Sequence, residues 1–423
     1  MQDGKDLDKW DKLLGTSSMP RWPTEPLQVA GEKVVPFYQP IISIASGRIV
    51  GYECLASSLN DKGNSRSFGH FFNNPKVRGD YQLEIDRALR YQGLKYFAEH
   101  PEAGYITLNI SPLWIENILE RAGSPMVPTL EMIKEIGIDP QRVVIEITES
   151  HGDIEMLKDM VAIYHEAGLM VAVDDFGAGA SQADRVEALK PDIVKLDMRL
   201  FKQAARGGHS ADIALSIAHV ANRIGCHIVC EGVETEEEFH FGIECSSNLI
   251  QGYLFSEARP HTLAAESTIE RVRSLQQSYL KEKSIRLGNA SEQKQQIRSI
   301  VNEIKKNNLD AKALQHNEQV LNSGIFRYYM CDESGNQITP SFEKGEAGFE
   351  EDTDWQGMNW SHRPYFPSFL VLNKLAGKNF ITSEVYRDLK TRKFCRTFAC
   401  YLSTDRILLV DALVEDEIVF VKE

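Results

Sequence analysis

The sequence lacks any long hydrophobic run. None of the apolar stretches in its 423 residues approaches the ~20 residues that a helix needs to cross a bilayer. The opening segment, MQDGKDLDKWDKLL, also has no apolar centre of the kind found in signal peptides. These absences predict a cytoplasmic protein without a membrane span. The hydrophobic share of 42% is that of a folded chain and excludes disorder for most of it.

Positive charge is also scarce. The chain has 47 Lys and Arg against 61 Asp and Glu, which gives a formal net charge of −14. Proteins bind duplex nucleic acids mainly by neutralising phosphates, so a nucleic-acid duplex is not expected as a partner. A small anion held through metal ions stays compatible with this charge. Cysteines are few, scattered and odd in number, at seven, which indicates reduced thiols and not a disulfide framework.

The first half of the chain alternates two kinds of segment. Between Val34 and Pro260, short β-branched runs such as YITLNI and VVIEIT alternate with helix-length amphipathic runs such as EMLKDMVAIYHEA. About eight such strands, each followed by a helix, favour a closed α/β barrel of the TIM (β/α)₈ type. The run YQPIISIASGRIVGYE has a Ser46-Gly47 turn between two alternating segments and predicts a hairpin, so one barrel strand is expected to be antiparallel.

The remaining sequence predicts a long helix and a second, smaller domain. After the barrel the chain turns polar, with apolar residues at helical spacing and a candidate break at Gly288-Asn289. The last hundred or so residues contain strand pairs joined by polar turns, typical of an α+β domain. The expected segments are an N-terminal extension (1–33), the barrel (34–261), a linker helix (262–322) and the α+β domain (323–423).

Nearly every expected barrel strand ends in a side chain that can bind a metal or a phosphate. These strand ends converge on one rim of a barrel, where active sites lie. Carboxylates gathered there would repel one another unless cations were bound, and oxygen ligands suit Mg²⁺ or Mn²⁺, with Ca²⁺ as another occupant. The positions are Glu53, Asn109, Glu146, Asp174, Asp175, Lys195, Asp197, Glu231 and Gln251.

Each of these residues also has a simpler interpretation. A single glutamate at a strand end is more often a solvated rim residue or a helix cap. Asp174 and Asp175 could form an ordinary turn before Gly177, and Lys195 could pair with Asp197. The joint pattern favours a site over these separate alternatives.

Seven strings between Val34 and Pro260 resemble the EAL family of cyclic-di-GMP phosphodiesterases. The resemblance implies a modified barrel with cyclic-di-GMP across its rim and one phosphodiester over two divalent cations, Mg²⁺ or Mn²⁺, with Ca²⁺ able to take the same place. One ester would be cut to give the linear dinucleotide pGpG, and a homodimer is expected. The strings are YQPIISIASGRIVGYECLAS, LNIS, IEITES, VAVDDFGAG, IVKLD, CEGVE and QGYLFS.

The resemblance also implies roles for single residues. Asp174 or Asp175 would also serve the second cation. Lys195 would hold the attacking water or steady the charge on phosphorus, and Glu149 would brace the loop that carries the two aspartates. Gln251 would orient water and substrate. Gln39, Leu55 and Ser57 are expected at the ligand. The first cation would be held by Glu53, Asn109, Glu146, Asp174 and Glu231.

The sequence departs from the family pattern in two places. Where the family has Glu-Ala-Leu-x-Arg, this chain has Glu53-Cys54-Leu55-Ala56-Ser57. Ser57 thus replaces the arginine, which removes a charge-assisted hydrogen bond to phosphate worth about 1.5–3 kcal/mol. In the loop usually written DDFGTGYSS, Ala178 and Ala180 lose a hydroxyl and an aromatic ring. Three hypotheses therefore stand: an active phosphodiesterase, a receptor that binds without efficient turnover, and a barrel hydrolase for another phosphoester.

The C-terminal domain more weakly resembles PAS-like or Cache-like sensory domains. The suggestive strings are HRPYF (362–366) and VYRD (385–388), whose Arg, Tyr and Asp residues could bind a small polar metabolite. An Arg-Asp pair beside core aromatics is the alternative interpretation. By analogy, a sensor joined to the barrel by a long helix would control hydrolysis.

Overall fold

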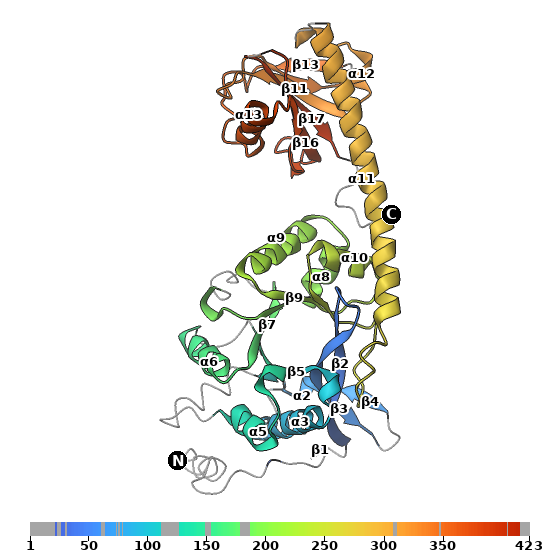
Figure 1. The fold of residues 1–423 in the computed structure, drawn as a ribbon, viewed down its shortest axis with the longest axis vertical. Helices are drawn as coiled ribbons and strands as arrows, with labels where there is room; N and C mark the ends of the chain where they lie inside the picture. Colours follow the sequence, from blue (N-terminus) through green and yellow to red (C-terminus); the bar gives the residue numbers. More distant parts are fainter. Residues whose placement is uncertain are drawn as a thin grey trace. The chain divides into compact units, whose positions relative to one another are not determined.

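The computed structural model of the chain contains two units, each described here by itself. The first comprises Met1–Ser278 with Phe420–Glu423, and the second Tyr279–Val419 (Figure 1). The structure describes residues 22, 27–29, 32–60, 64–72, 74, 77, 79–110, 127–148, 154–177, 187–307, 311–346, 348–403 and 405–414.

A β-hairpin opens the barrel of the first unit. Strand β2 (Glu32–Ser43) pairs antiparallel with β3 (Ile49–Leu59). Gly47 turns the chain at φ 70°, a backbone conformation that suits glycine, and its N–H donates to Ser43 O at 2.8 Å. The hairpin predicted around Ser46-Gly47 is therefore confirmed.

Eight of the described strands close into a barrel. In the order β2-β10-β9-β8-β7-β6-β5-β3 each strand is hydrogen-bonded to the next, and the β2–β3 pairing closes the ring. Strand β2 is antiparallel to both of its neighbours, while the other pairs are parallel. This confirms the modified (β/α)₈ barrel with one antiparallel strand. The further barrel strands are β5 (Tyr105–Ile110), β6 (Val143–Thr148), β7 (Met170–Phe176), β8 (Ile193–Leu196), β9 (His227–Cys230) and β10 (Leu249–Ile250). Short strands β1 (Leu27–Val29) and β4 (Ser65–Ser67) extend the sheet beside β2 and β3.

Helices surround this barrel (Figure 1). Helix α9 buries only alanines, at positions 211, 214, 218 and 221, so one narrow face can lie close to the strands. Inside the barrel, Val144, Ala172, Ile193 and Val229 form a closed apolar cluster. The described helices are α2 (Gly69–Phe72), α3 (Gly79–Glu99), α5 (Pro128–Ile136), α6 (Ile154–Glu166), α8 (Met198–Ala205), α9 (His209–Ile224) and α10 (Glu236–Glu244).

A single long helix, α11 (Ile269–Lys306), follows the barrel. It runs without interruption through Gly288 and Asn289, so the expected break there is wrong. An interior glycine costs a helix only about 1 kcal/mol relative to alanine. Gly288 is exposed and has no neighbouring atoms to disturb, so the flanking turns can absorb that cost. The boundary between the two units falls within this helix, after Ser278.

The second unit is an antiparallel sheet with helices on both faces. Along the sheet the strand order is β13-β12-β11-β17-β16-β14, and β15 pairs with β16. The strands are β11 (Ile325–Cys331), β12 (Ser341–Lys344), β13 (Phe349–Asp352), β14 (Phe380–Thr382), β15 (Tyr386–Arg387), β16 (Phe394–Tyr401) and β17 (Ile407–Leu413). The helices besides α11 are α12 (Glu318–Leu321) and α13 (Tyr365–Ala376).

Successive side chains of β11 point to opposite faces of the sheet, and each face packs against a separate hydrophobic core. Tyr328 points to the face that packs with Ile297 and Ile300 of α11, while Tyr329 points to the opposite face, with Phe366 and Phe369 of α13.

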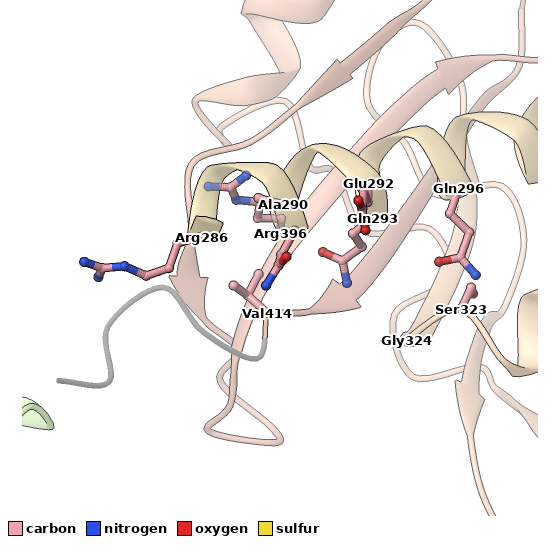
Figure 2. A pocket seen from close by; sticks show the side chains of 10 residues that line it. Arg286, Ala290, Glu292, Gln293, Gln296, Ser323, Gly324, Arg396 and Val414 are labelled. Carbon is pink, nitrogen blue, oxygen red and sulfur yellow. The ribbon is translucent and has the colours of Figure 1, made fainter. Parts of the chain in front are cut away.

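Helix α11 also has a polar contact with this sheet. The Nε2 of Gln293 donates to Leu413 O at 2.8 Å. Figure 2 shows the open hollow beside this contact, between α11 and the strand that carries Arg396. Among the described residues, no helix is both long and apolar enough to span a membrane.

Candidate functional site

The rim residues converge on a buried lysine. Lys195, in β8, is 1% exposed. Its Nζ lies 2.5 Å from Glu231 Oε1, 3.0 Å from Glu146 Oε2, 3.4 Å from Glu53 Oε2 and 3.5 Å from Asp174 Oδ1. Five different barrel strands thus supply one charged cluster, as the positional pattern predicted, although Glu53 lies within β3 and not at its end.

Two amide side chains fix the orientation of Glu53. Asn109 Nδ2 donates to its Oε1 at 2.9 Å, and Gln251 Nε2 donates to its Oε2 at 2.8 Å. Gln39 lies directly opposite Glu53 in the β2–β3 ladder. The structure therefore brings the amides of Asn109 and Gln251 to the Glu53 carboxylate and places Gln39 on the neighbouring strand.

Burial and charge act in opposite directions on the acids of the cluster. Burial raises the pKa of Glu146 well above its usual value, and its acidic neighbours add to this effect. Burial likewise raises the pKa of Glu231 to about 8. For Glu53 the effect of burial is outweighed by Lys195, Asn109 and Gln251, so its pKa is lowered.

The lysine itself keeps its charge. Burial works to lower the pKa of Lys195, but the surrounding carboxylates outweigh it and hold the pKa well above the usual value. Lys195 is therefore an ammonium at neutral pH.

The two consecutive aspartates have different surroundings. The register of β7 shifts between Val173 and Phe176, and Asp175 adopts a left-handed φ of 56°. Its N–H donates to Asp174 Oδ1 at 3.0 Å. Asp174 faces Lys195, whereas the Asp175 side chain is largely open to solvent. The pKa of Asp175 is raised by the remaining loss of hydration and by the negative charges of Asp174 and Asp197.

The suggested pairing of Lys195 with Asp197 is wrong. Asp197 is the N-cap of α8, where its Oδ1 accepts from Leu200 N–H at 2.8 Å. Strand β8 ends at Leu196, so Asp197 no longer follows the alternation that would place it beside Lys195.

The position of the missing arginine lies on the same strand as Glu53. Leu55 and Ser57 follow Glu53 at alternate positions of β3, so all three share a face. Ser57 is 6% exposed and lies between its ladder partners Val35 of β2 and Ser67 of β4. Three predicted positions, Glu149, Ala178 and Ala180, lie outside the described residues.

The donor set fits divalent cations chemically. Four acidic side chains face a single ammonium, so negative charge exceeds positive charge once all four are ionised. Two buried oxygen atoms, Glu146 Oε1 and Gln251 Oε1, have no hydrogen-bond partner in the structure. Such oxygen-rich, anionic surroundings suit Mg²⁺, Mn²⁺ or Ca²⁺.

The carboxylates are nevertheless arranged around the lysine. Within the described ranges, no three acidic, His or Cys side chains are grouped so that they could hold a metal ion as they stand. The Lys195 ammonium takes the central place instead. Cations would therefore have to compete with Lys195 for these oxygens.

The second unit contains a cavity of about 420 Å³ at the two strings singled out in the sequence. Arg363 and Tyr365 from the first string, and Tyr386 and Asp388 from the second, all line it. The Arg, Tyr and Asp residues of the two strings thus lie around one cavity, as the sequence suggested. The partner of Asp388, however, is Arg327, whose Nη2 donates to Asp388 Oδ1 at 2.7 Å.

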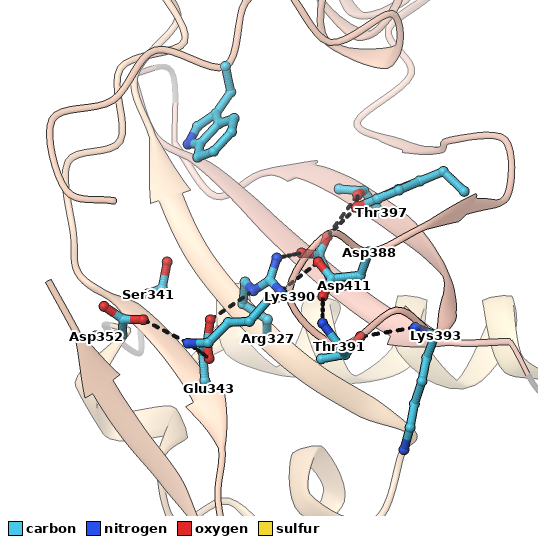
Figure 3. A network of polar contacts seen from close by, with 12 residues as sticks. Arg327, Ser341, Glu343, Asp352, Asp388, Lys390, Thr391, Lys393, Thr397 and Asp411 are labelled. Atoms are coloured by element: carbon cyan, nitrogen blue, oxygen red, sulfur yellow. Dashed lines mark hydrogen bonds and ion pairs between the residues drawn. The ribbon is translucent and has the colours of Figure 1, made fainter. Parts of the chain in front are cut away.

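Arg327, which lines this cavity, was not among the residues predicted from the sequence. Arg327 also bonds to Asp411 Oδ2 and Glu343 Oε1, each at 3.3 Å (Figure 3). Lys390 bridges Glu343 and Asp352, at 2.5 and 3.1 Å. Arg327 and Asp411 lie in ordinary strand sequence, so no local signal could have identified them.

Two family models match the chain. The EAL domain model matches residues 26–258, and the model described as an EAL-domain associated signalling protein domain matches residues 268–418. The two matches thus cover most of the sequence in succession.

Similar proteins match either most of this chain or about half of it. The Bacillus subtilis protein named uncharacterized EAL-domain containing protein YkuI is 29% identical over 391 residues, covering 90% of this chain and 94% of its own. The crystal structure of that protein in complex with substrate c-di-GMP and calcium superposes with a TM-score of 0.79 at 28% identity, covering 90% of this chain and 97% of that one. The cyclic di-GMP phosphodiesterase RocR of Pseudomonas aeruginosa is 28% identical over 233 residues, which are 53% of this chain and 57% of RocR.

Proposed function

Because the chain belongs to the EAL domain family, we propose that its barrel binds cyclic-di-GMP at the rim and hydrolyses one phosphodiester to give linear pGpG. The observation that carries this proposal is the convergence of four carboxylates, from four strands, on Lys195. The similarity to YkuI, whose structure contains c-di-GMP and calcium, supports the choice of ligand.

Two divalent cations, Mg²⁺ or Mn²⁺, complete the proposed site, and Ca²⁺ can occupy it. Bound there, they would acidify a water and neutralise the phosphodiester. Asp174 and Asp175 would serve the second cation, and Glu149 would brace their loop. The first cation would be held by Glu53, Asn109, Glu146, Asp174 and Glu231.

The other residues of the rim act on the substrate and on the acids. Lys195, an ammonium at neutral pH, holds the attacking water or steadies the charge that develops on the phosphoryl oxygens. Gln251 and Asn109 hold Glu53 in one orientation, so its oxygens do not have to reorganise. Gln39, opposite Glu53, contacts the nucleotide, and Leu55 lies beside it on β3.

A second candidate function is a receptor that binds cyclic-di-GMP with little or no turnover. Ser57 favours it, because serine cannot supply the charge-assisted contact that arginine gives to phosphate. In either case we propose that the second unit senses a small polar metabolite and acts on the barrel through α11, in a cytoplasmic homodimer.

The test measures binding and hydrolysis on one sample of the full chain with Mn²⁺. Calorimetry reports binding of cyclic-di-GMP, and chromatography reports pGpG. The enzyme hypothesis predicts product from the wild type and from the control Glu102→Ala, an exposed acid that precedes β5 at the barrel end opposite the rim, but none from Glu53→Ala. Binding without product supports the receptor, and the absence of binding contradicts both.

A further inference from the structure

We propose that the cavity of the second unit binds a small organic monocarboxylate, with Arg363 as the residue that holds the carboxylate. This inference rests on the proposed sensing role of that unit and names the chemical class of its ligand. It concerns the 420 Å³ cavity beside the Arg327 network.

The cavity has the size and lining of a small-molecule site. Binding pockets for small ligands have volumes of roughly 300–1,000 Å³ and combine apolar walls with a few polar groups. Here the aromatic side chains are Tyr329, Trp355, Trp360, Tyr365 and Tyr386. A ligand with a flat or apolar body can pack against these rings.

Among the residues that the structure describes, Arg363 is a cation without an anionic partner. Its guanidinium carbon lies 5.6 Å from the ring centre of Trp360 and 6.0 Å from that of Tyr386, so the two rings hold it in place. Within the part of the chain that the structure describes, no carboxylate forms an ion pair with it. A planar guanidinium held between rings presents its N–H groups to a carboxylate in two parallel hydrogen bonds.

The other cations of the cavity are already committed. Arg327 bonds to Asp388, Asp411 and Glu343, and Lys390 bonds to Glu343 and to Asp352 (Figure 3). Arg387 lies 3.9 Å from the ring centre of Phe394 and donates to Arg392 O. An incoming anion would have to displace a carboxylate from Arg327 or Lys390, whereas Arg363 needs no such exchange.

The acidic groups limit the charge of the ligand. Four carboxylates face the two cations of the network, so this side of the cavity is not an electropositive surface. A dianion such as phosphate would meet repulsion there that a single carboxylate at Arg363 largely avoids. This difference favours monocarboxylates over phosphates.

The experiment titrates acetate, butyrate and benzoate into the full chain without cyclic-di-GMP or metal ions, and follows heat and tryptophan fluorescence. Trp355 and Trp360 line the cavity, so occupancy is expected to change the emission. The matched amides acetamide, butyramide and benzamide, and inorganic phosphate, are the comparison ligands. At least one acid is expected to bind about tenfold or more tightly than its amide and than phosphate.

Variants assign the carboxylate contact to Arg363. Arg363→Gln is expected to weaken binding of that acid by about 10- to 100-fold, and Arg363→Lys by less, because lysine keeps the charge but not the planar fork. Arg298→Gln is the control, since Arg298 lies 6.0 Å from the ring centre of Phe380 and outside the cavity. It is expected to bind as the wild type does.

Three results would overturn the proposal. The first is the absence of saturable binding of any of the three acids to the wild type. The second is equal affinity for an acid and its amide, which needs no folded variant. The third is wild-type affinity in Arg363→Gln. Because binding is measured without cyclic-di-GMP, a failure of this proposal is distinguishable from a failure of hydrolysis at the barrel.

Discussion

At the scale of single residues, the barrel rim depends on charge balance. A lysine enclosed by four carboxylates would be costly to bury alone, and so would the carboxylates; together they offset much of the loss of hydration. The local sequence IVKLD showed only that Lys195 lies inside an apolar strand. Its partners come from four other strands, so the sequence pattern predicted that these charges meet but did not give the pairs.

Replacing the central lysine should destabilise the protein. Lys195→Met leaves buried carboxylates without a counter-charge, for which the expected loss is about 3–5 kcal/mol of unfolding free energy. Urea denaturation in the presence of a chelator measures it. Lys202→Met is the matched control, because its ion pair with Glu234 at 2.6 Å is partly exposed, far more so than that of Lys195, and is worth below about 1 kcal/mol. Equal losses in both variants would contradict the role given to Lys195.

Restoring the arginine of the family pattern should strengthen ligand binding. Ser57 shares a strand face with Glu53, so Ser57→Arg returns a guanidinium to that face. We expect the Kd for cyclic-di-GMP to fall about tenfold or more, as measured by calorimetry. Ser65→Arg adds the same charge to the exposed strand β4 and should leave the Kd unchanged. An unchanged Kd in Ser57→Arg would mean that this position does not limit binding.

The buried Asp411 should make stability depend on pH. Burial raises its pKa from 3.8 to about 6, against the opposing effects of Arg327 and Thr397. The folded state therefore binds this proton more tightly than the unfolded state. The stabilisation is complete below the unfolded pKa and is lost as pH rises through the folded value, on the order of 3 kcal/mol between about pH 4 and 6.

Removing the titrating group tests this prediction. In Asp411→Asn the decrease in stability between about pH 4 and 6, measured from urea unfolding curves, should become smaller by the contribution of Asp411, because the side chain no longer binds a proton. The contributions of Glu146 and Glu231, whose pKa values are also raised, should remain. The lowered pKa of Asp388 acts at more acidic pH and leaves this window unaffected. A wild-type slope that persists in Asp411→Asn would assign the pH dependence to another group.

At the scale of elements, the local sequence predicted correctly those features that interactions between near neighbours in the chain determine. Alternating apolar residues and a Ser-Gly turn were enough to predict the β2–β3 hairpin and its antiparallel place in the barrel. The expected helix break at Gly288 was wrong, because the intrinsic preference of one glycine is weak beside a helix whose later turns pack Ile297 and Ile300 on a sheet.

The turn that follows β10 has no room for a side chain at Gly252. A Cβ at Gly252 would collide with the backbone N and O of Val233, which cannot move as a side chain can. Gly252→Ala should lower the unfolding free energy by about 1–3 kcal/mol and weaken cyclic-di-GMP binding, because the adjacent Gln251 holds Glu53. Denaturation and calorimetry measure the two effects. Gly79→Ala, with open space around it, should change neither.

At the scale of the whole molecule, α11 is the continuous connection between a unit that carries the rim and a unit that carries the cavity. Family models match each part separately, which agrees with two units that have their own cores. If the second unit regulates the first, the signal is expected to require an unbroken helix.

Breaking α11 should uncouple the units. Ser284→Pro, at an exposed position, removes a backbone hydrogen bond and costs the helix about 3 kcal/mol. We expect a bound monocarboxylate to change the rate of pGpG formation in the wild type and in Ser284→Ala, but not in Ser284→Pro, while calorimetry still detects carboxylate binding to all three. A full response in the proline variant would exclude transmission through this helix.

The sequence by itself determined the barrel, its reversed strand and the acidic rim. Apolar periodicity and turn residues act between near neighbours, and parallel strands bring their carboxyl ends to one edge whatever lies between them. Only the tertiary structure decided which charges meet. Lys195 and Glu146 are 49 residues apart, and Arg327 and Asp411 are 84 apart. Such pairs form only when separate elements pack, and among the described residues packing left Arg363 without a carboxylate.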